Sequence, residues 1–185
     1  MATAEGPAPA PSGLAHGLRW ALKRSFVDYV RRMPDGKGWV GDGATPVGTD
    51  EMFFSYDAEA SAGASAGSGP DGVATSESAR VLAFAGDVRF TGHFGMLFVR
   101  IARPWLEVEG DVVTVTVEDP HGAAGAPRVP LVTARLERLP DQDGTALLLG
   151  HDVRLTESAV DVFNEVYPAG EAFEDFAVQV PCLLW

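Results

Sequence analysis

The sequence predicts a mainly β domain: an antiparallel β-sandwich-like fold with two short α-helices, one N-terminal and one near the C-terminus. Two observations support this prediction. From residue 81 onward, apolar and polar residues alternate in short runs that recur at regular spacing and are separated by turn residues. The 21 glycines and 13 prolines supply many turns, and such a composition argues against a helical bundle.

The N-terminal helix is predicted over Leu18–Met33 (LRWALKRSFVDYVRRM). At about 100° per residue, one narrow arc of this helix collects the apolar side chains Leu18, Leu22, Phe26, Tyr29 and Met33. Tyr29 lies in the middle of that arc, so we expect it to face the body of the domain, where its phenol needs a hydrogen-bond partner. The helix alone is compatible with a structural core tyrosine and with a functional one. The turn residues of Met33–Gly36 (MPDG) end the helix.

The remaining elements follow in chain order. Residues 36–49 predict a glycine-rich loop with one short strand near Trp39-Val40, and residues 57–79 predict a long flexible surface loop of low complexity. A second helix is expected over Glu157–Val166, with Thr156 as its N-cap and a turn at residues 167–170 as its end. The other predicted strands are Met52–Tyr56, Val81–Phe90, Gly95–Ala102, Trp105–Glu109, Val112–Glu118, Val129–Leu139, Ala146–Gly150 and Ala172–Val180.

A chain of 185 residues is long enough for one domain with a sizeable core. Residues 1–13 are rich in alanine, proline and glycine and predict a disordered tail, so the single domain is expected to cover residues 14–185. The net charge is −12, but residues 19–37 carry +4 and the rest of the chain −16. The acidic body argues against nucleic-acid binding. The basic segment offers either a local site for an anionic ligand or a solvated face.

The sequence also bears on cysteine chemistry and on where the protein is located. Cys182 is the only cysteine, which excludes a disulfide framework and a thiolate metal site, and we interpret it as a small apolar residue. The N-terminus lacks the basic and apolar regions of a secretory signal, and no run reaches the roughly 18 apolar residues of a membrane span. We therefore expect a cytoplasmic protein without a membrane span.

Short motifs add one candidate site. Gly63–Gly67 (GASAG) has the letters of a nucleophile elbow, but it lies in the low-complexity loop and is interpreted as a chance match. The four histidines show no spacing that is typical of a zinc site. His93 follows a predicted strand and is flanked by Gly92 and Gly95, so it can reach a ligand or bond a nearby carbonyl in a turn.

Three separated stretches together resemble the HtaA domain of bacterial haem-uptake proteins. They are Leu18–Val30 (LxWxxKxSFxxYV), Phe84–Leu97 (FxGxVxFTGHxGxL, followed by Arg103-Pro104) and Leu155–Gly170 (LTxxAxxxFxxxYxxG). In order and approximate spacing they cover most of residues 14–180. The combination is specific, whereas each stretch alone is a weak indication.

The resemblance implies binding of ferric haem b. By position, Tyr29 would supply the axial phenolate to the haem iron, His93 would hydrogen-bond that phenolate, and Tyr167 would support the site. A free tyrosine has a pKa of about 10, but a ferric ion and a hydrogen-bond donor both favour the phenolate. Phe26 and Phe94 are expected to contact haem, and the wider set of apolar candidates is Met33, Met96 and Phe163. The candidate partners for the two propionates are Lys23, Arg31 and Arg32.

Three functions remain open from the sequence. The first is a haem carrier, buffer or sensor that exchanges haem with a donor or acceptor protein. The second is a haem-dependent enzyme that uses the same pocket, because phenolate ligation is compatible with peroxide chemistry. The third is an interaction domain that keeps the fold and has lost haem, with Tyr29 and His93 as structural residues.

Overall fold

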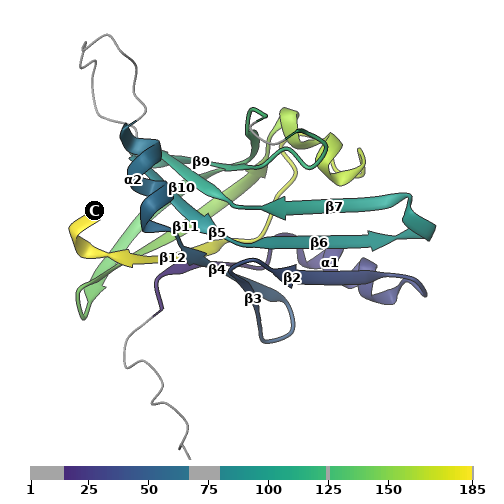
Figure 1. Cartoon of the computed structure of the whole chain (residues 1–185), viewed down its shortest axis with the longest axis horizontal. Coiled ribbons are helices and arrows are strands. Elements are labelled where there is room, and N and C mark those ends of the chain that lie inside the picture. Colours follow the sequence, from purple (N-terminus) through teal and green to yellow (C-terminus); the bar gives the residue numbers. More distant parts are fainter. Residues whose placement is uncertain (1–14, 67–79, 124–125, 185) are drawn as a thin grey trace, which may run out of the picture.

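The computed structural model describes residues 15–66, 80–123 and 126–184. Eight antiparallel strands close into a barrel: β1 (Gly17–Trp20), β4 (Glu51–Tyr56), β5 (Arg80–Ala85), β8 (Trp105–Glu109), β9 (Val112–Val117), β10 (Val129–Gln142), β11 (Thr145–Leu155) and β12 (Phe176–Pro181). Around the ring the order is β1-β12-β11-β10-β9-β8-β5-β4, and β4 pairs back with β1 (Figure 1). A further strand, β3 (Ala44–Val47), pairs with β4 on the same edge as β5, but at different residues of β4.

A second, three-stranded sheet extends from the barrel. It has the order β2-β6-β7, and we call it the lateral sheet: β2 (Lys37–Gly41), β6 (Asp87–Gly92) and β7 (Leu97–Ala102). Its strands run away from the barrel toward the end of the molecule where the helix α1 (Arg24–Arg32) also lies (Figure 1). The β6–β7 turn therefore lies at a tip of the molecule, beside the helix.

The chain passes from the barrel into the lateral sheet at Gly86, between β5 and β6. Gly86 has a φ of 140°, and a Cβ there would lie 2.7 Å from the Ala44 side chain and 2.7 Å from the Phe54 ring. The predicted strand Val81–Phe90 is therefore two strands that belong to different sheets. Only glycine combines this backbone conformation with so close an approach.

The core fills the barrel and continues under the lateral sheet. Its largest fully buried side chains include Trp20, Phe54, Phe84, Phe163 and Phe176. The Trp20 indole N–H donates to the Glu174 carbonyl oxygen at 2.7 Å, so the ring is buried without an unsatisfied donor. Burying side chains of this size stabilises the fold by about 1.5–3 kcal/mol each.

The predicted helix Leu18–Met33 is wrong in its first part. Residues 17–20 form the strand β1, and the helix begins only at Arg24. Leu22, with a φ of 58°, separates the two elements. In β1, buried Leu18 and Trp20 alternate with exposed Arg19, as the period of two in a strand requires. The strand β1 closes the barrel because it pairs with both β12 and β4.

The second predicted helix, Glu157–Val166, is also wrong. Two 3₁₀ turns, η2 (Glu157–Ala159) and η3 (Asp161–Phe163), occupy this segment, and Asn164 and Glu165 end it with left-handed φ values of 54° and 58°. The Thr156 hydroxyl donates to the Pro130 carbonyl oxygen instead of capping a helix. Short i→i+3 turns of this kind keep Val162 and Phe163 in the core.

Other expectations are confirmed or refined. The mainly antiparallel β class is confirmed, and every predicted strand has an observed counterpart, whereas β3 was not expected. The predicted loop 57–79 begins with a helix, α2 (Ala58–Ala66). Asp57 caps its N-terminus, because the Asp57 carboxylate accepts a hydrogen bond from the Ala60 N–H at 2.9 Å. Residues 67–79 and the predicted tail, residues 1–13, lie outside the described residues.

Candidate functional site

Tyr29 and His93 meet at the tip of the lateral sheet. Tyr29 is on α1, and His93 begins the 3₁₀ turn η1 (His93–Gly95) between β6 and β7. The phenol Oη and the imidazole Nε2 are hydrogen-bonded at 2.5 Å. The two residues are 64 positions apart in the sequence, so the fold and not local structure creates this pair.

Tyr29 faces outward, contrary to the prediction that it faces the core. The buried face of α1 is formed by Phe26, Val27 and Val30, and Tyr29 lies roughly 100° from the middle of that face. Its side chain is 48% exposed. Because a structural tyrosine would normally be buried with its ring in the core, this exposure favours a functional interpretation of the residue.

A close approach between α1 and β6 brings the pair together. A Cβ on Gly92 would lie 2.7 Å from the methyl carbon of Met33, so the absence of a side chain at residue 92 makes room for Met33. Met33 lies one helical turn beyond Tyr29, and Gly92 directly precedes His93. The contact therefore positions both members of the pair.

The turn that carries His93 is held in an uncommon conformation. His93 and Phe94 both have left-handed backbones, with φ values of 49° and 55°. The Phe94 N–H donates to Oδ2 of Asp35 at 2.6 Å, and this hydrogen bond is the main reason that the pKa of Asp35 lies below its usual value. Asp35 thus ties the end of α1 to the turn.

Protonation of Asp35 is expected to release the turn. Because the pKa of Asp35 is lowered in the folded protein, its contribution is fully present above the ordinary aspartate pKa and is lost as the pH falls through the lowered value. We expect the Phe94 amide resonance to titrate with Asp35 in an NMR pH series, and Asp35→Ala to make hydrogen exchange of that amide several-fold faster at neutral pH. Exchange unchanged from that of the unsubstituted protein would contradict the assignment, and Asp143→Ala, in an exposed turn, is the control.

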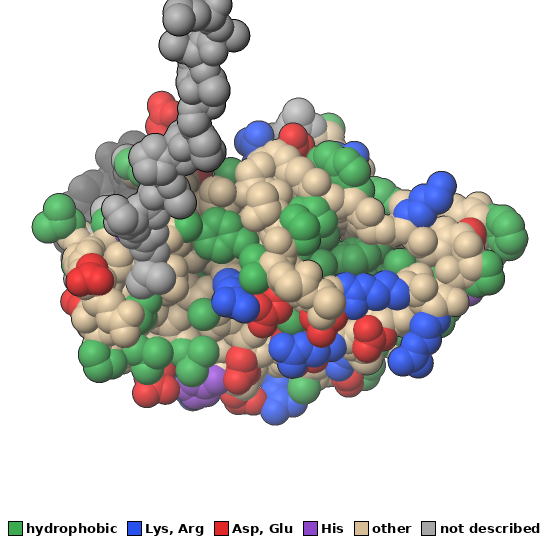
Figure 2. Space-filling view, turned by 90° about the horizontal axis from the view of Figure 1, so that it is seen from below, with side chains coloured by type: hydrophobic (Ala, Val, Ile, Leu, Met, Phe, Trp, Pro, Cys, Tyr) green, Lys and Arg blue, Asp and Glu red, His purple; other side chains and the backbone are tan. Residues whose placement is uncertain are grey.

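A shallow apolar hollow of about 200 Å³ lies beside the pair. It is lined by Tyr29, His93, Met96, Leu97, Asn164 and Val166. Of the lining side chains, Met96 and Val166 are 77% and 60% exposed; Phe94, next to His93 in the turn, is 94% exposed and does not line the hollow. Apolar side chains are also visible at this tip in the space-filling view (Figure 2). Large apolar side chains held in solvent around a polar pair are typical of a surface that a ligand or partner covers.

The remaining predicted site residues do not join this hollow. Phe26 is buried, with its ring 5.2 Å from Phe90 and 5.6 Å from Phe163. Tyr167 is half-buried against Phe163 and Phe173, and no described contact connects it to the Tyr29–His93 pair. Phe26 and Tyr167 thus belong to the layer beneath the site.

Of the three predicted cations, two are already paired. The Lys23 ammonium lies 2.5 Å from Glu171 and 2.6 Å from the Ala172 carbonyl oxygen, and it also lies over the Tyr167 ring. Arg31 pairs with Asp50 at 2.8 Å. Arg32 is exposed and has no such partner among the described residues, and it follows Tyr29 by three positions on α1.

Sequence reasoning missed Asp35, Leu97, Asn164 and Val166. Asn164 and Val166 come from the segment that the sequence analysis interpreted as a helix. Asn164 was a weak signal that this segment ends earlier, because asparagine tolerates the left-handed conformation that ends η3. Nothing in the sequence places Val166 next to Met96. That proximity depends on how the C-terminal segment packs on the lateral sheet.

The structure also places the other motifs that the sequence analysis considered. In residues 15–66, 80–123 and 126–184, no three His, Cys, Asp or Glu side chains gather as a metal site would require, and no helix is long and apolar enough to cross a membrane. Cys182 is half-buried, and burial raises the pKa of its thiol. Residues 63–66 of the GASAG motif lie within α2, so the serine is not at a strand-to-helix turn, and residue 67 lies outside the described residues.

The fold and the site together define a class of antiparallel barrel domain that presents an exposed tyrosine–histidine pair at the end of a lateral sheet. The chain belongs to the HtaA family: the family model, described as Htaa, matches residues 15–179. No curated protein matches the chain.

Solved structures share this fold. The N-terminal domain of HtaA from Corynebacterium glutamicum superposes with a TM-score of 0.67 at 20% identity, over 90% of this chain and 97% of that domain. The heme binding protein HtaB from the same organism gives a TM-score of 0.65 at 19% identity, over 90% and 92% of the two chains. The C-terminal domain of HtaA gives 0.60 at 20% identity, over 90% and 99%.

Proposed function

We propose that this domain binds ferric haem b, with Tyr29 as the axial ligand and His93 as the hydrogen-bond partner of the phenolate. The observation that supports this most is the 2.5 Å contact between the Tyr29 Oη and the His93 Nε2, in an exposed apolar hollow of a member of the HtaA family. One of the structurally similar proteins, HtaB, is a heme binding protein.

The chemistry of the site fits haem better than a free metal ion. A zinc ion typically takes three or four protein ligands, and the described residues offer no group of three His, Cys, Asp or Glu side chains. A porphyrin supplies four nitrogen ligands of its own, so one protein ligand is sufficient. Tyr29 can serve as that ligand because its phenol is exposed and at the edge of the hollow.

The residues around Tyr29 and His93 suit the other parts of a haem group. His93 would donate its Nε2–H to the phenolate oxygen, which favours the charged form and fixes the ring. Met96, Phe94 and Val166 would cover an apolar ring, and such contact would remove their exposed side chains from water. Arg32, which has no ion-pair partner in the described part of the chain and follows Tyr29 by three positions, is our candidate for a propionate.

These features support a carrier, buffer or sensor that exchanges haem with a donor or acceptor protein. The hollow is shallow and its apolar rim is exposed, so a ligand there would remain accessible to a partner. The test is a hemin titration of the purified protein followed by absorption spectroscopy. A saturable one-to-one complex with a tyrosinate-type ferric spectrum supports the proposal. Hemin uptake that never saturates would contradict it and favour an interaction domain without haem.

Removing the His93 imidazole is expected to weaken hemin binding about 10- to 100-fold and to shift the absorption spectrum, because groups that orient a metal ligand typically contribute that much. We suggest His93→Ala together with His93→Asn, since asparagine tolerates the left-handed backbone at this position. His151→Ala, on β11 outside the site, is the matched control. Wild-type affinity with an unchanged spectrum in both His93 variants would exclude a role for the imidazole.

A further inference from the structure

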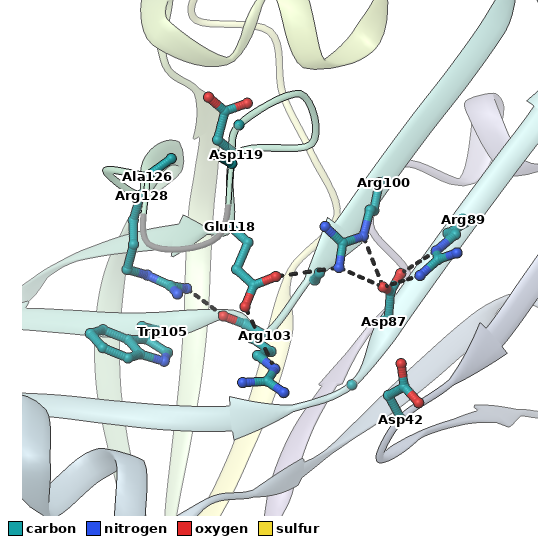
Figure 3. Close-up of a pocket in the computed structure, with 14 residues that line it drawn as sticks. Asp42, Asp87, Arg89, Arg100, Arg103, Trp105, Glu118, Asp119, Ala126 and Arg128 are labelled. Carbon is teal, nitrogen blue, oxygen red and sulfur yellow. Dashed lines mark hydrogen bonds and ion pairs between the residues drawn. The ribbon is translucent and has the colours of Figure 1, made fainter.

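A second cavity lies where the lateral sheet meets the barrel. Its volume is about 640 Å³, and none of its lining residues lines the hollow beside Tyr29. Four arginines line it: Arg89, Arg100, Arg103 and Arg128 (Figure 3). The whole chain has only 14 lysines and arginines against 26 acidic residues, so this concentration of arginine is unusual for the molecule.

Three of the arginines share two carboxylates. Asp87 is 2% exposed and accepts hydrogen bonds from Arg89 and Arg100, at 2.8 Å from each guanidinium. Burial raises the pKa of Asp87, but the hydrogen bonds from the two arginines outweigh burial and hold the pKa below its usual value. Glu118 lies 3.3 Å from Arg100 and 3.6 Å from Arg103. In this network three positive charges face two negative ones.

Arg128 forms no ion pair with a carboxylate among the described residues. Its guanidinium stacks on the Trp105 ring at 4.1 Å and donates to the hydroxyl and carbonyl oxygens of Thr116, at 3.0 and 2.9 Å, and to the Arg103 carbonyl oxygen. All of these acceptors are neutral. Its Nη1 has no partner among the described residues. Burial lowers the pKa of Arg128 to about 10, although the negative charges of Glu118 and Glu107 act in the opposite direction, so these carboxylates offset only part of the cost of burying the guanidinium.

Two further acidic residues line the cavity but do not neutralise this charge. The Asp119 carboxylate accepts the His121 N–H at 2.9 Å and points away from the arginines in Figure 3. Asp42 acts on Arg89 only through the longer-range charge interaction. At the end of the cavity formed by Arg103 and Arg128, both guanidinium groups therefore keep unused N–H donors. The carboxylate of Glu118 pairs there with Arg103, and also with Arg100, but reaches Arg128 only through the longer-range charge interaction.

We propose that this cavity binds a small oxyanion, a phosphate or carboxylate group, held by Arg103 and Arg128. A planar guanidinium presents paired N–H donors that match the oxygens of either group. Trp105 fixes the Arg128 guanidinium by stacking, so little side-chain freedom is lost when a ligand binds. This site is independent of the proposed haem site, because the two share no lining residue.

The test is isothermal titration calorimetry of the haem-free full chain at neutral pH and low salt, with inorganic phosphate in one arm and citrate in the other. We expect saturable binding in at least one arm. A response to phosphate alone identifies a phosphate ligand, and a response to citrate alone identifies a carboxylate ligand. Heats of dilution only, in both arms, would overturn the proposal.

Two variants locate the site. Arg128→Gln is expected to weaken binding about tenfold or more, since it removes a charge-assisted donor. Arg103→Asn is the second variant, because Arg103 is exposed with a φ of 46° that asparagine tolerates, and the fold is expected to persist. Arg135→Gln is the control, an exposed arginine paired with Asp111 elsewhere. Equal affinity in all three variants would show that any binding occurs outside this cavity.

Discussion

Tyr29→Phe is expected to abolish saturable hemin binding, lowering the affinity by more than about 100-fold. The substitution removes only the phenol oxygen, which is the atom that we assign to the iron and which lies 2.5 Å from His93. Loss of a group that merely orients a ligand costs about 10- to 100-fold, so loss of the ligand itself is expected to cost more. A hemin titration by absorption spectroscopy measures the effect, and the tyrosinate-type spectrum should vanish.

The controls separate this effect from damage to the fold. Tyr29 is half-exposed, so the phenylalanine variant is expected to fold as stably as the unsubstituted protein. Tyr56→Phe changes a tyrosine that packs on Phe84 in the barrel and should bind hemin normally. Tyr167→Phe, in the layer beneath the site, should have a smaller effect than Tyr29→Phe. If Tyr29→Phe retained both affinity and spectrum, the ligand assignment would be wrong.

Gly86→Ala is expected to destabilise the domain by about 2–5 kcal/mol, the largest effect of any single methyl group that we predict. Two costs combine at this position: a backbone with a φ of 140°, and a Cβ that would lie 2.7 Å from both Ala44 and Phe54. Neither neighbour can move easily, because Phe54 is fully buried in the core. Chemical denaturation followed by circular dichroism measures the free energy of unfolding.

Gly110→Ala is the matched control for this prediction. Gly110 also has a positive φ, 62°, but a Cβ there meets no atom within 4 Å. It should therefore show only the backbone cost of about 1–2 kcal/mol. A Gly86 variant no less stable than the Gly110 variant would mean that the passage between the two sheets tolerates a side chain.

Much of the fold could be predicted because strands with one buried face leave a period of two in the sequence. The β8 and β9 segments show this clearly. The error at Leu18–Trp20 arose because a short apolar segment next to a true helix satisfies both periodicities. Its strand identity depends on pairing with β4 and β12, which are remote in sequence and leave no local signal.

The candidate site could be predicted only in part. The resemblance to the HtaA domain selected Tyr29 and His93, and the structure brings them together although 64 positions separate them. Helical periodicity alone placed Tyr29 on the wrong face of α1. The predicted helix ran through Leu22, whereas the chain turns at this residue and α1 begins only at Arg24. The opposite wall of the hollow, at Val166, follows two consecutive left-handed residues, Asn164 and Glu165, of which only the asparagine gives even a weak signal in the sequence.

The arrangement of the lateral sheet has a consequence for how the domain responds to heat, denaturant and mutation. The barrel closes on itself, whereas within the described part of the chain β2 and β7 each pair with β6 alone and have no strand at their outer edges. A sheet with two open edges is expected to separate locally at a lower free energy than the ring to which it is attached. The tip that carries His93 is therefore expected to open locally more readily than the ring, and substitutions there are expected to change the rate of this opening more than the stability of the ring.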